Sequence, residues 1–477
     1  MWILNQLLLV ISIGFVYVEA VDLIQDYLSP RASQAIINGT GWRTLNQTVL
    51  SKPYDPKAHP RGIINLGLAE NWLIQDKLKE YLQHNFTIDP LSHLTYGQGA
   101  AASPTLRKAL AGFFTTHFKP NQPISEYDFI VASGVTSLID SLTWCICSDN
   151  EAIIIPRPLY NGFPTDMRLR SNGTLLPASF MRDNETVSLE DAFNPTSLNR
   201  SLEKTLEESN RHSGKAVRGV VIANPHNPLG RCYSKEALMT LASFCGRHRI
   251  HFISDEIYAN SVFPDENLFT SVLSLNLSGI IDPNLVHVMY GMSKDFGASG
   301  LRLGALHSRN QNLIQAAAGV NLFSWPSYLA QDMWARLLQN ETKTNELLSQ
   351  NRNLLNQTYS NVTSWLDRRN ITYFRGGNAG LFVWARVLNV SESIGPQKYN
   401  DMVTCFLETC RCHGVNIGDG RNFLAEGGFG WFRITFSYPF KMLECGLKRL
   451  GQVLDKMKDG ECVRNETCAG VNITLCE

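Results

Sequence analysis

The chain has 477 residues, 44% of them hydrophobic, and its 43 basic residues balance its 43 acidic ones. This length and apolar content predict a globular protein with one large and one smaller domain, and exclude a disordered chain. A formal net charge of zero offers no bulk attraction to a polyanion, so we expect no nucleic-acid partner.

The first twenty residues differ from the rest. An apolar run from Leu7 to Val18 ends at Val18-Glu19-Ala20, which resembles a small-residue cleavage site, and it is too short to cross a bilayer comfortably. We therefore predict a signal peptide over residues 1–20, no stable membrane insertion, and a protein of the secretory pathway. Because no Lys or Arg precedes the run, an uncleaved anchor or a buried N-terminal helix remains an alternative.

Sites for N-glycosylation also favour the secretory pathway. Composition predicts roughly five N-x-[ST] sites by chance. The sequence has more, at Asn38, Asn46, Asn85, Asn172, Asn184, Asn199, Asn276, Asn340, Asn356, Asn361, Asn370, Asn389, Asn465 and Asn472. This excess predicts a glycoprotein. The alternative is a surface that is simply rich in Asn and Thr.

The eleven cysteines suggest an oxidising compartment, because three of them lie close together in a polar C-terminal tail, at Cys462, Cys468 and Cys476. The others lie mostly in apolar segments, where a buried thiol is the ordinary explanation: Cys145, Cys147, Cys232, Cys245, Cys405, Cys410, Cys412 and Cys445. No pair has the spacing of a zinc site, so we predict no metal.

Short apolar runs alternate with longer amphipathic stretches. Six runs have the character of buried strands, at residues 128–132, 152–156, 219–224, 251–255, 286–290 and 303–307. Helical patterns lie between them, for example at 136–147 and at 234–247, where Ser234 is the expected N-cap. After Gln311 the pattern is mainly helical to about Arg369, and then mixed to about Lys458. This order predicts an α/β fold with a mostly parallel sheet and ligands at the strand ends.

The pattern divides the chain into five segments. We predict the signal peptide at 1–20, an N-terminal arm and part of a small domain at 21–70, and a large cofactor-binding domain at 71–335. A small α+β C-terminal domain follows at 336–460, and a cysteine-containing tail at 461–477.

The strongest chemical motif is Tyr290-Gly-Met-Ser-Lys294-Asp-Phe-Gly-Ala-Ser-Gly-Leu-Arg302-Leu-Gly304. It places a lysine at a strand end, before a Gly-rich turn and an arginine eight residues later. The amine suits a Schiff base with an aldehyde cofactor, and the guanidinium suits a phosphate held through two hydrogen bonds. A solvated lysine before a turn is the plain alternative.

Three further segments supply partners for such a cofactor. Asp255 ends a strand, where a buried carboxylate can pair with a protonated pyridine nitrogen, and Tyr258 follows it. Asn227 lies in a proline-rich turn after another strand, and its amide can donate to a phenolic oxygen. Val135 and Thr136 open a helix whose free N–H groups suit a phosphate. A capped strand end, a plain loop and an ordinary helix start are the respective alternatives.

In this order and at these separations, the segments resemble class I/II pyridoxal 5'-phosphate (PLP)-dependent aminotransferases, especially the branch of 1-aminocyclopropane-1-carboxylate synthase and its fungal relatives. Three more stretches are similar to that branch: Gly67-Leu-Ala-Glu-Asn71, Asn378-Ala-Gly-Leu-Phe382 and Gly430-Trp-Phe-Arg433. The similarity covers roughly Leu28 to Met457. It implies the three-layer aspartate-aminotransferase fold, PLP as cofactor, and a homodimer with shared active sites.

The resemblance also implies a role for each matching residue. Lys294 would be the Schiff-base lysine and proton shuttle, Asp255 the pyridinium partner, and Arg433 the ligand of the substrate α-carboxylate. The ring would be held by Tyr160, Asn227 and Tyr258, and the phosphate by Val135, Thr136, Arg302 and Tyr96 of a second subunit. Taken alone, Tyr160 reads as a core aromatic, Tyr96 as turn packing and Arg433 as a surface ion pair.

One departure concerns the phosphate. Gly291 stands where the family usually has a serine, and Ser293 is the candidate substitute. The predicted function is an aminotransferase acting on a small α-amino acid. Glu70 slightly favours the alternative function, which is a carbon-sulfur lyase or a cyclopropane-forming elimination enzyme. A secreted relative without catalysis is a second alternative.

Overall fold

The computed structural model describes residues 28–97, 99–149, 151–181, 187–264, 269–391, 394–426 and 429–458, and in the tail 462, 468, 471 and 473–476. The predicted signal peptide lies outside these residues. The chain divides into two compact units, with the boundary in the sequence between Lys52 and Pro53. The described part of the first unit is helical, with α2 (Pro30–Asn38), α3 (Thr40–Leu45) and the short π-helix η1 (Asn46–Leu50).

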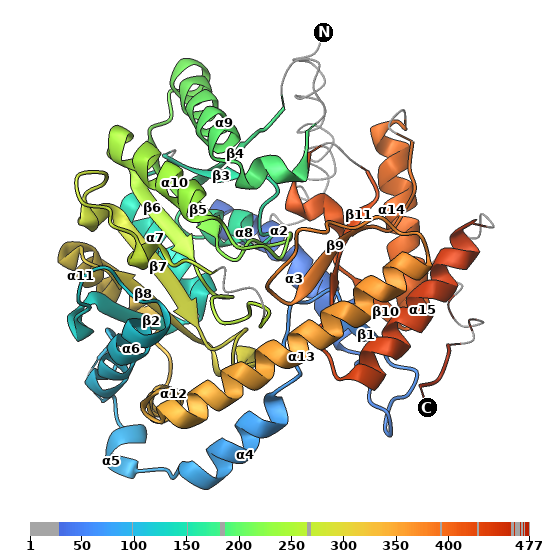
Figure 1. Ribbon diagram of the computed structural model, residues 1–477, viewed down its shortest axis with the longest axis horizontal. Helices are drawn as coiled ribbons and strands as arrows, with labels where there is room; N and C mark the ends of the chain where they lie inside the picture. Colours follow the sequence, from blue (N-terminus) through green and yellow to red (C-terminus); the bar gives the residue numbers. More distant parts are fainter. Residues whose placement is uncertain are drawn as a thin grey trace. The chain divides into compact units, whose positions relative to one another are not determined.

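The second unit contains a seven-stranded sheet (Figure 1). Its strands are β2 (Phe129–Ser133), β3 (Ala152–Pro156), β4 (Thr174–Ala178), β5 (Val217–Ala223), β6 (His251–Asp255), β7 (Val286–Gly291) and β8 (Leu303–Ser308). The strand order is β2-β8-β7-β6-β5-β3-β4, and only β8 runs antiparallel to its neighbours. The six predicted strands are confirmed within two residues. Strand β4 was not predicted, because its half-buried edge sequence contains Pro177.

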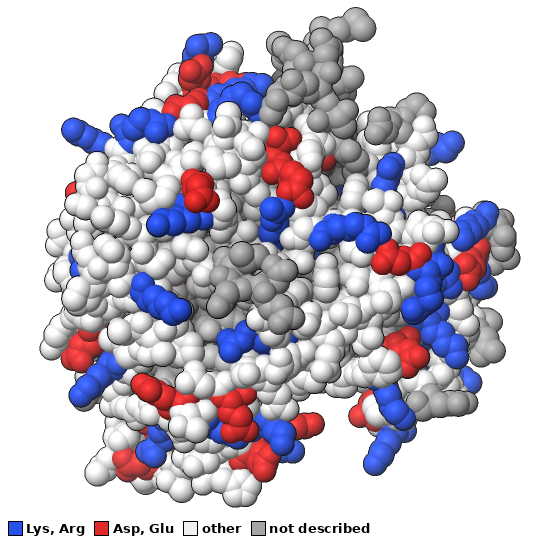
Figure 2. All heavy atoms as spheres, in the orientation of Figure 1, with Lys and Arg blue, Asp and Glu red and all other residues white. Residues whose placement is uncertain are grey.

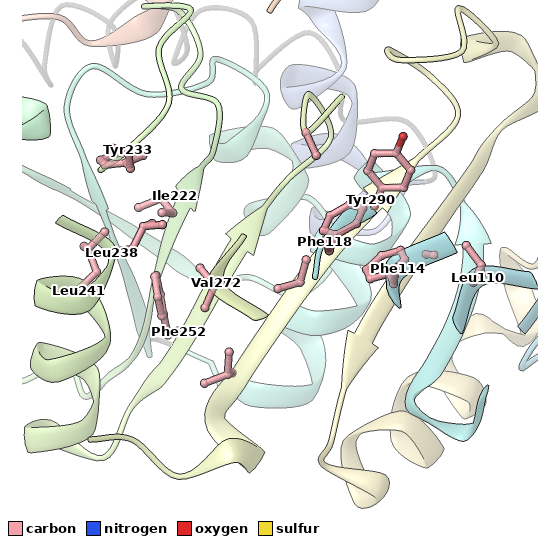
Figure 3. Close-up of a cluster of buried hydrophobic side chains, with 14 of the residues drawn as sticks. Leu110, Phe114, Phe118, Ile222, Tyr233, Leu238, Leu241, Phe252, Val272 and Tyr290 are labelled. Carbon is pink, nitrogen blue, oxygen red and sulfur yellow. The ribbon is translucent and has the colours of Figure 1, made fainter. Parts of the chain in front are cut away.

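Helices cover both faces of this sheet, because alternate strand residues point to opposite sides. Ile153 and Ile155 pack with α7 (Val135–Ile146), α8 (Phe163–Arg168) and α11 (Gln311–Val320). Ile154 belongs to the opposite core, with α6 (Pro104–His117), α9 (Pro195–Glu208), α10 (Lys235–His248) and α12 (Tyr328–Gln339). Figure 3 shows part of this second core, including Phe114, Phe252 and Tyr290. The predicted three-layer α/β fold is therefore confirmed.

Shorter elements connect these layers. Between β1 (Ile64–Leu66) and α6 the chain forms α4 (Gln75–Asn85) and α5 (Pro90–His93). The short turns are η2 (Glu126–Asp128), η3 (Leu189–Phe193), η4 (Ser209–Ser213), η5 (Val272–Ser274), η6 (Pro283–Leu285), η7 (Ser299–Leu301), η8 (Asn321–Phe323) and η9 (Gly420–Phe423). The predicted N-cap of α10 is present, since the Ser234 hydroxyl accepts from the Ala237 N–H at 3.2 Å.

The C-terminal part has its own core around two small sheets. Strand β1 (Ile64–Leu66) pairs in parallel with β10 (Val415–Ile417), and β9 (Phe382–Arg386) pairs antiparallel with β11 (Trp431–Thr435). The helices packed here are α13 (Glu341–Arg368), α14 (Pro396–Cys412) and α15 (Phe440–Lys458). A strand from the beginning of the second unit thus shares a sheet with one from near its end.

Three disulfides tie the tail to this core. They join Cys405 to Cys462 and Cys412 to Cys468 on α14, and Cys445 to Cys476 on α15. The expectation of buried thiols was therefore wrong for Cys405, Cys412 and Cys445. These residues do lie on apolar helix faces, but each pairs with a cysteine of the tail, which the local sequence did not reveal.

A buried arginine holds the same tail. Arg449 donates from Nε to the Thr474 carbonyl at 3.0 Å, and from its two terminal nitrogens to the carbonyls of Pro60, Gly62 and Gly414 at 2.7–2.8 Å. Backbone carbonyls thus solvate a cation that is fully removed from water.

The described surface carries mixed charge. Figure 2 shows basic and acidic side chains interspersed on one face, without a broad patch of either sign. Among the described helices, none combines the length and apolar character needed to cross a membrane.

Candidate functional site

Most predicted site residues lie at one edge of the seven-stranded sheet. Strands β3, β5, β6 and β7 run parallel, so their carboxyl ends share that edge, and Tyr160, Asn227, Asp255 and Lys294 stand at or just beyond those ends. Because β8 runs the other way, it begins at the same edge, directly after Arg302. Ligands of open α/β sheets bind at this position.

Lys294 is held by the chain segment that precedes α4. Its Nζ donates to the Ala69 carbonyl at 2.6 Å, and its own carbonyl accepts from Asn71 Nδ2 at 2.9 Å. Asn71 in turn donates to Asn351 Oδ1 on α13 at 2.7 Å. Burial, followed by the positive charge of Arg433, lowers the pKa of the Lys294 amine to about 8. Roughly a tenth of this amine is therefore unprotonated and nucleophilic at neutral pH.

Asp255 is a buried carboxylate at the end of β6. Burial raises its pKa to about 7, against the opposing effects of the Ile257 N–H, which donates to Oδ1 at 3.2 Å, and of the Lys294 charge. Because burial destabilises the charged form of this carboxyl group, a cationic partner would stabilise it strongly. Tyr258 is also buried, with its ring edge-on to Phe382 at 5.4 Å, and burial raises the pKa of its phenol. The Tyr258 hydroxyl therefore stays protonated and able to donate.

A cup suited to a phosphate forms between α7 and the start of β8. Arg302 adopts the left-handed conformation (φ 54°), and its Nη2 donates to the Ser133 carbonyl at 3.1 Å. A Cβ at Gly134 would lie 2.4 Å from that nitrogen, so only glycine leaves room for it. Val135 and Thr136 begin α7 directly after Gly134, and the first N–H groups of a helix lack intrahelical acceptors.

The departure at Gly291 has a steric cause. A Cβ at this position would lie 2.5 Å from the Leu303 carbonyl oxygen and 3.2 Å from the Gly304 Cα, because Gly291 and Gly304 face each other across β7 and β8. A serine would force these strands apart. Ser293 is buried nearby and is the serine of this motif before Lys294.

Arg433 is buried on β11 rather than paired at the surface. Its terminal nitrogens donate to Asn227 Oδ1 at 3.1 Å and to the Gly67 carbonyl at 2.8 Å. The guanidinium carbon lies 5.0 Å from the ring centres of Phe382 and Phe423. Its Nε has no hydrogen-bond partner among the described residues. A cation buried without a carboxylate, and with one donor unused, is suited to binding an anionic group.

Three predicted site residues are less buried than Asp255, Tyr258 and Arg433. Glu70 is half-buried, accepts from the Ser299 hydroxyl at 3.3 Å, and its charge raises the pKa of Lys294 against the effect of burial. Tyr160 is half-buried, with its ring edge-on to Phe163 at 5.2 Å. Tyr96 is not buried with the others, because its side chain is 87% exposed.

Sequence reasoning missed several residues that shape this site. Asn71 and Phe423 contact Lys294 and Arg433 respectively. Asn71 ends the quoted Gly67-Leu-Ala-Glu-Asn71 stretch but was given no role there, and no motif pointed to Phe423. Asp166 was also missed. Burial, with the nearby charges of Asp255 and Asp140, raises its pKa to about 7. Its place in α8, six residues after Tyr160, was the one available signal. Among the described residues, no group of three or more potential ligands could hold a metal ion.

A lysine of lowered pKa, a buried aspartate, a helix start beside Arg302 and a buried guanidinium whose Nε has no partner among the described residues together fit a PLP-dependent enzyme acting on amino acids. Residues 65–450 match the family model described as aminotransferase class I and II, and the chain belongs to this family.

Curated relatives agree with this assignment. The chain is 32% identical to a mouse protein described as a probable inactive 1-aminocyclopropane-1-carboxylate synthase-like protein 2, over 86% of this chain and 68% of that one. It is 29% identical to 1-aminocyclopropane-1-carboxylate synthase 7 of Arabidopsis thaliana, over 88% and 92%. It is 30% identical to the probable aminotransferase sirI of Leptosphaeria maculans, over 86% and 95%. The resemblance to this branch is confirmed.

Solved structures confirm the fold. An aromatic aminotransferase from Pyrococcus horikoshii superposes with a TM-score of 0.67 at 20% identity, covering 83% of this chain and 96% of the other. The family depends on PLP, and the residues at the strand edge fit that cofactor. Asp255 is a buried anion without a cationic hydrogen-bond donor among the described residues, and Gly134 leaves the space that Arg302 occupies.

Proposed function

We propose that the protein is an aminotransferase for a small α-amino acid. The observation that carries this proposal is the position of Arg433. Its buried guanidinium donates to Asn227, which follows strand β5 at the sheet edge where Lys294 also lies. The Nε of this guanidinium has no hydrogen-bond partner among the described residues. An amino acid has one carboxylate and one amine on the same carbon. Arg433 can bind the carboxylate while the amine is directed to the cofactor, which fixes the orientation of the Cα–H bond.

The chain's own residues then have distinct tasks. When bound, PLP supplies an electron sink for the electron pair of the broken Cα–H bond. Asp255 keeps positive charge at the pyridine nitrogen, and Lys294 accepts and returns the proton, as its lowered pKa allows. Tyr258 and Asn227 would hold the phenolic oxygen of PLP, and Tyr160 would contact its ring. Val135, Thr136, Ser293 and Arg302 would bind its phosphate.

A spectroscopic titration tests this proposal. Purified protein with PLP should show the visible absorbance of a lysine-bound cofactor, and a suitable amino acid should convert it to the amine form with release of a keto acid. Lys294→Ala should abolish the borohydride-stable attachment, and Lys343→Ala on α13 serves as the matched control that keeps it. A wild-type protein that takes up no PLP would support the non-catalytic alternative instead.

Elimination chemistry is the second candidate, and Glu70 favours it. Its carboxylate lies near enough to Lys294 to raise the pKa of that amine, so it can act on a leaving group beside the reacting carbon. Release of ammonia and a fragment, with no keto acid matching the substrate and no amine form of the cofactor, would select this reaction over transamination. Glu70→Gln should then reduce elimination more than cofactor binding.

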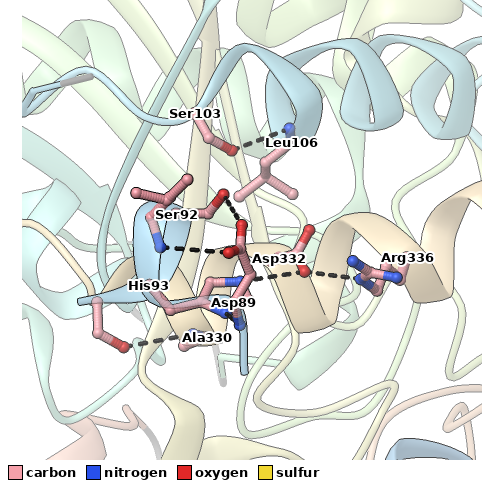
Figure 4. Close-up of polar contacts among 10 residues, drawn as sticks. Asp89, Ser92, His93, Ser103, Leu106, Ala330, Asp332 and Arg336 are labelled. Atoms are coloured by element: carbon pink, nitrogen blue, oxygen red, sulfur yellow. Dashed lines mark hydrogen bonds and ion pairs between the residues drawn. The ribbon is translucent and has the colours of Figure 1, made fainter. Parts of the chain in front are cut away.

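We also propose a homodimer. The segment that contains α5 exposes a row of apolar side chains, including Leu91 (83% exposed) and Tyr96, and Phe323 of η8 is 86% exposed. Figure 4 shows how this segment is fixed to α12, with His93 Nε2 3.3 Å from Asp332 Oδ2. An ordered, exposed apolar surface of this kind suits a second copy, whose Tyr96 would complete the phosphate cup.

The oligomeric state is measured by light scattering. Leu91→Glu together with Phe323→Glu should give monomers with weakened PLP binding, whereas Tyr96→Phe should leave the dimer intact and weaken PLP binding alone. A wild-type monomer that binds PLP fully would contradict the proposal.

Finally, we propose that the protein is an exported glycoprotein. The three disulfides support an oxidising compartment, since cytosolic proteins rarely keep such bonds. Expression of the full chain in animal cells should give a product in the medium or secretory organelles whose N-terminus is Val21. A cytosolic product that retains Met1 would contradict the proposed export.

A further inference from the structure

Asparagines of the N-x-[ST] sites are distributed differently from the other asparagines of this chain. Seven of the twenty other described asparagines are buried, at Asn71, Asn224, Asn227, Asn260, Asn321, Asn351 and Asn416. None of the eleven described N-x-[ST] asparagines is buried. Both groups of asparagines have the same side chain and belong to the same folded protein. The difference in burial is therefore associated with the N-x-[ST] motif and not with the polarity of asparagine.

Five of these asparagines in the second unit are exposed at the ends of elements rather than within them. Asn172 lies in the turn before β4, Asn276 after η5, Asn340 before α13, Asn370 after α13 and Asn389 after β9. Asn172 and Asn370 adopt the left-handed conformation, with φ values of 52° and 54°. A bulky group attached at these turns would extend into solvent without displacing a packed side chain.

Hydrogen bonds orient two of the side-chain amides. Asn276 Oδ1 accepts from the Ser278 N–H at 3.3 Å, and Asn340 Oδ1 accepts from the Lys343 N–H at 3.1 Å. In each case the oxygen faces the chain, so the nitrogen is the other arm of the amide. That nitrogen is the atom to which a glycan is joined.

We propose that Asn172, Asn276, Asn340, Asn370 and Asn389 carry N-linked oligosaccharides. This inference rests on the proposed export. In the transfer, Nδ2 loses one proton and bonds to the anomeric carbon of an oligosaccharide, and the diphosphate of a lipid-linked donor leaves with the electron pair of the broken bond. The donor is the lipid-linked sugar diphosphate of the secretory pathway.

Asn85 is not part of this set. Its Nδ2 already donates to the Tyr81 carbonyl at 2.8 Å, and the apolar segment proposed to bind a second copy begins three residues later, at Ile88. No N-x-[ST] site occurs between Leu91 and Tyr96 or between Leu322 and Tyr328.

The test is the mass of the full chain, expressed in animal cells and collected from both cells and medium, before and after peptide N-glycosidase treatment. We expect the mass to fall on treatment, and the enzyme to convert the five asparagines to aspartate, which is read by peptide mass spectrometry in heavy-oxygen water. An unchanged mass in both fractions, or conversion at none of the five positions, would overturn the inference.

A matched pair of variants separates the motif from the fold. Ser278 is exposed, so Ser278→Ala should remove one glycan, from Asn276, whereas Ser278→Thr should keep it. Loss of the glycan in both variants would contradict modification at that motif. The PLP absorbance of the same samples reports on the proposed enzyme separately, so a protein that binds PLP without carrying glycans overturns this inference alone.

Discussion

The two halves of the candidate site are built in different ways. In the cofactor half, Asp255 ends a strand and Lys294 follows the next one by three residues, so each position depends on a short local sequence. In the carboxylate half, Arg433 is held by Gly67, Asn227, Phe382 and Phe423, which are distant from one another in the chain. Substitutions in the first half should affect the chemistry directly, and those in the second should affect substrate binding.

The largest effect is expected at Asp255. Asp255→Asn removes the buried negative charge that favours a protonated pyridine nitrogen, so kcat should fall by about 1000-fold while PLP remains attached. Steady-state kinetics and the absorbance spectrum measure this together. Glu256→Gln is the matched control, because Glu256 is also a buried carboxylate with a pKa raised to about 7, but its Oε1 accepts from the Ser254 hydroxyl and the Val272 N–H. Equal losses in both variants would contradict the assigned role.

Arg433→Lys should have the next largest effect. Lysine keeps the charge but cannot form the paired hydrogen bonds to a carboxylate, so kcat/KM should fall by about 10-fold to 100-fold, mainly through KM. Arg386→Lys is the control, because Arg386 lies on the neighbouring strand β9 and donates to the carbonyls of Phe429 and Val390. A normal KM in Arg433→Lys would place substrate binding elsewhere.

The pH dependence of PLP attachment tests the lowered pKa of Lys294 in the cofactor half of the site. Only the unprotonated amine of Lys294 attacks the aldehyde, so the attachment rate of cofactor-free enzyme should rise about tenfold per pH unit and level off above about pH 8. Stopped-flow absorbance measures this rate. The same titration with N-acetyl-lysine amide corrects for the cofactor's own protonation, and a midpoint near the free-lysine value of 10.5 would contradict the effect of burial.

The smallest effect is expected at Phe423. Phe423→Leu keeps an apolar contact but removes one of the two rings beside Arg433, so KM should rise by about 3-fold to 10-fold with kcat little changed. Thermal unfolding of the same variant shows whether the packing is maintained. A fall in kcat with an unchanged KM would mean that this ring acts on the chemistry instead.

Much of this architecture could be predicted because burial and strand propensity are local properties. Six strands of the large sheet were found from their apolar runs, and the residues at their ends followed. Strand β4 could not be found in this way, because an edge strand buries little of its surface and tolerates Pro177. The need for glycine at position 291 could not be predicted from the sequence either, since the carbonyl that excludes a side chain there belongs to Leu303 on the neighbouring strand.

The sequence by itself determined the family, the cofactor and the strand-end positions of Asp255 and Lys294, because a motif and its neighbours along the chain carry that information. Only the tertiary structure decided which residues surround Arg433 and that the tail cysteines pair with α14 and α15. Those contacts join residues that are remote in sequence, and their energy comes from burial that exists only once the two small sheets have formed around a common core.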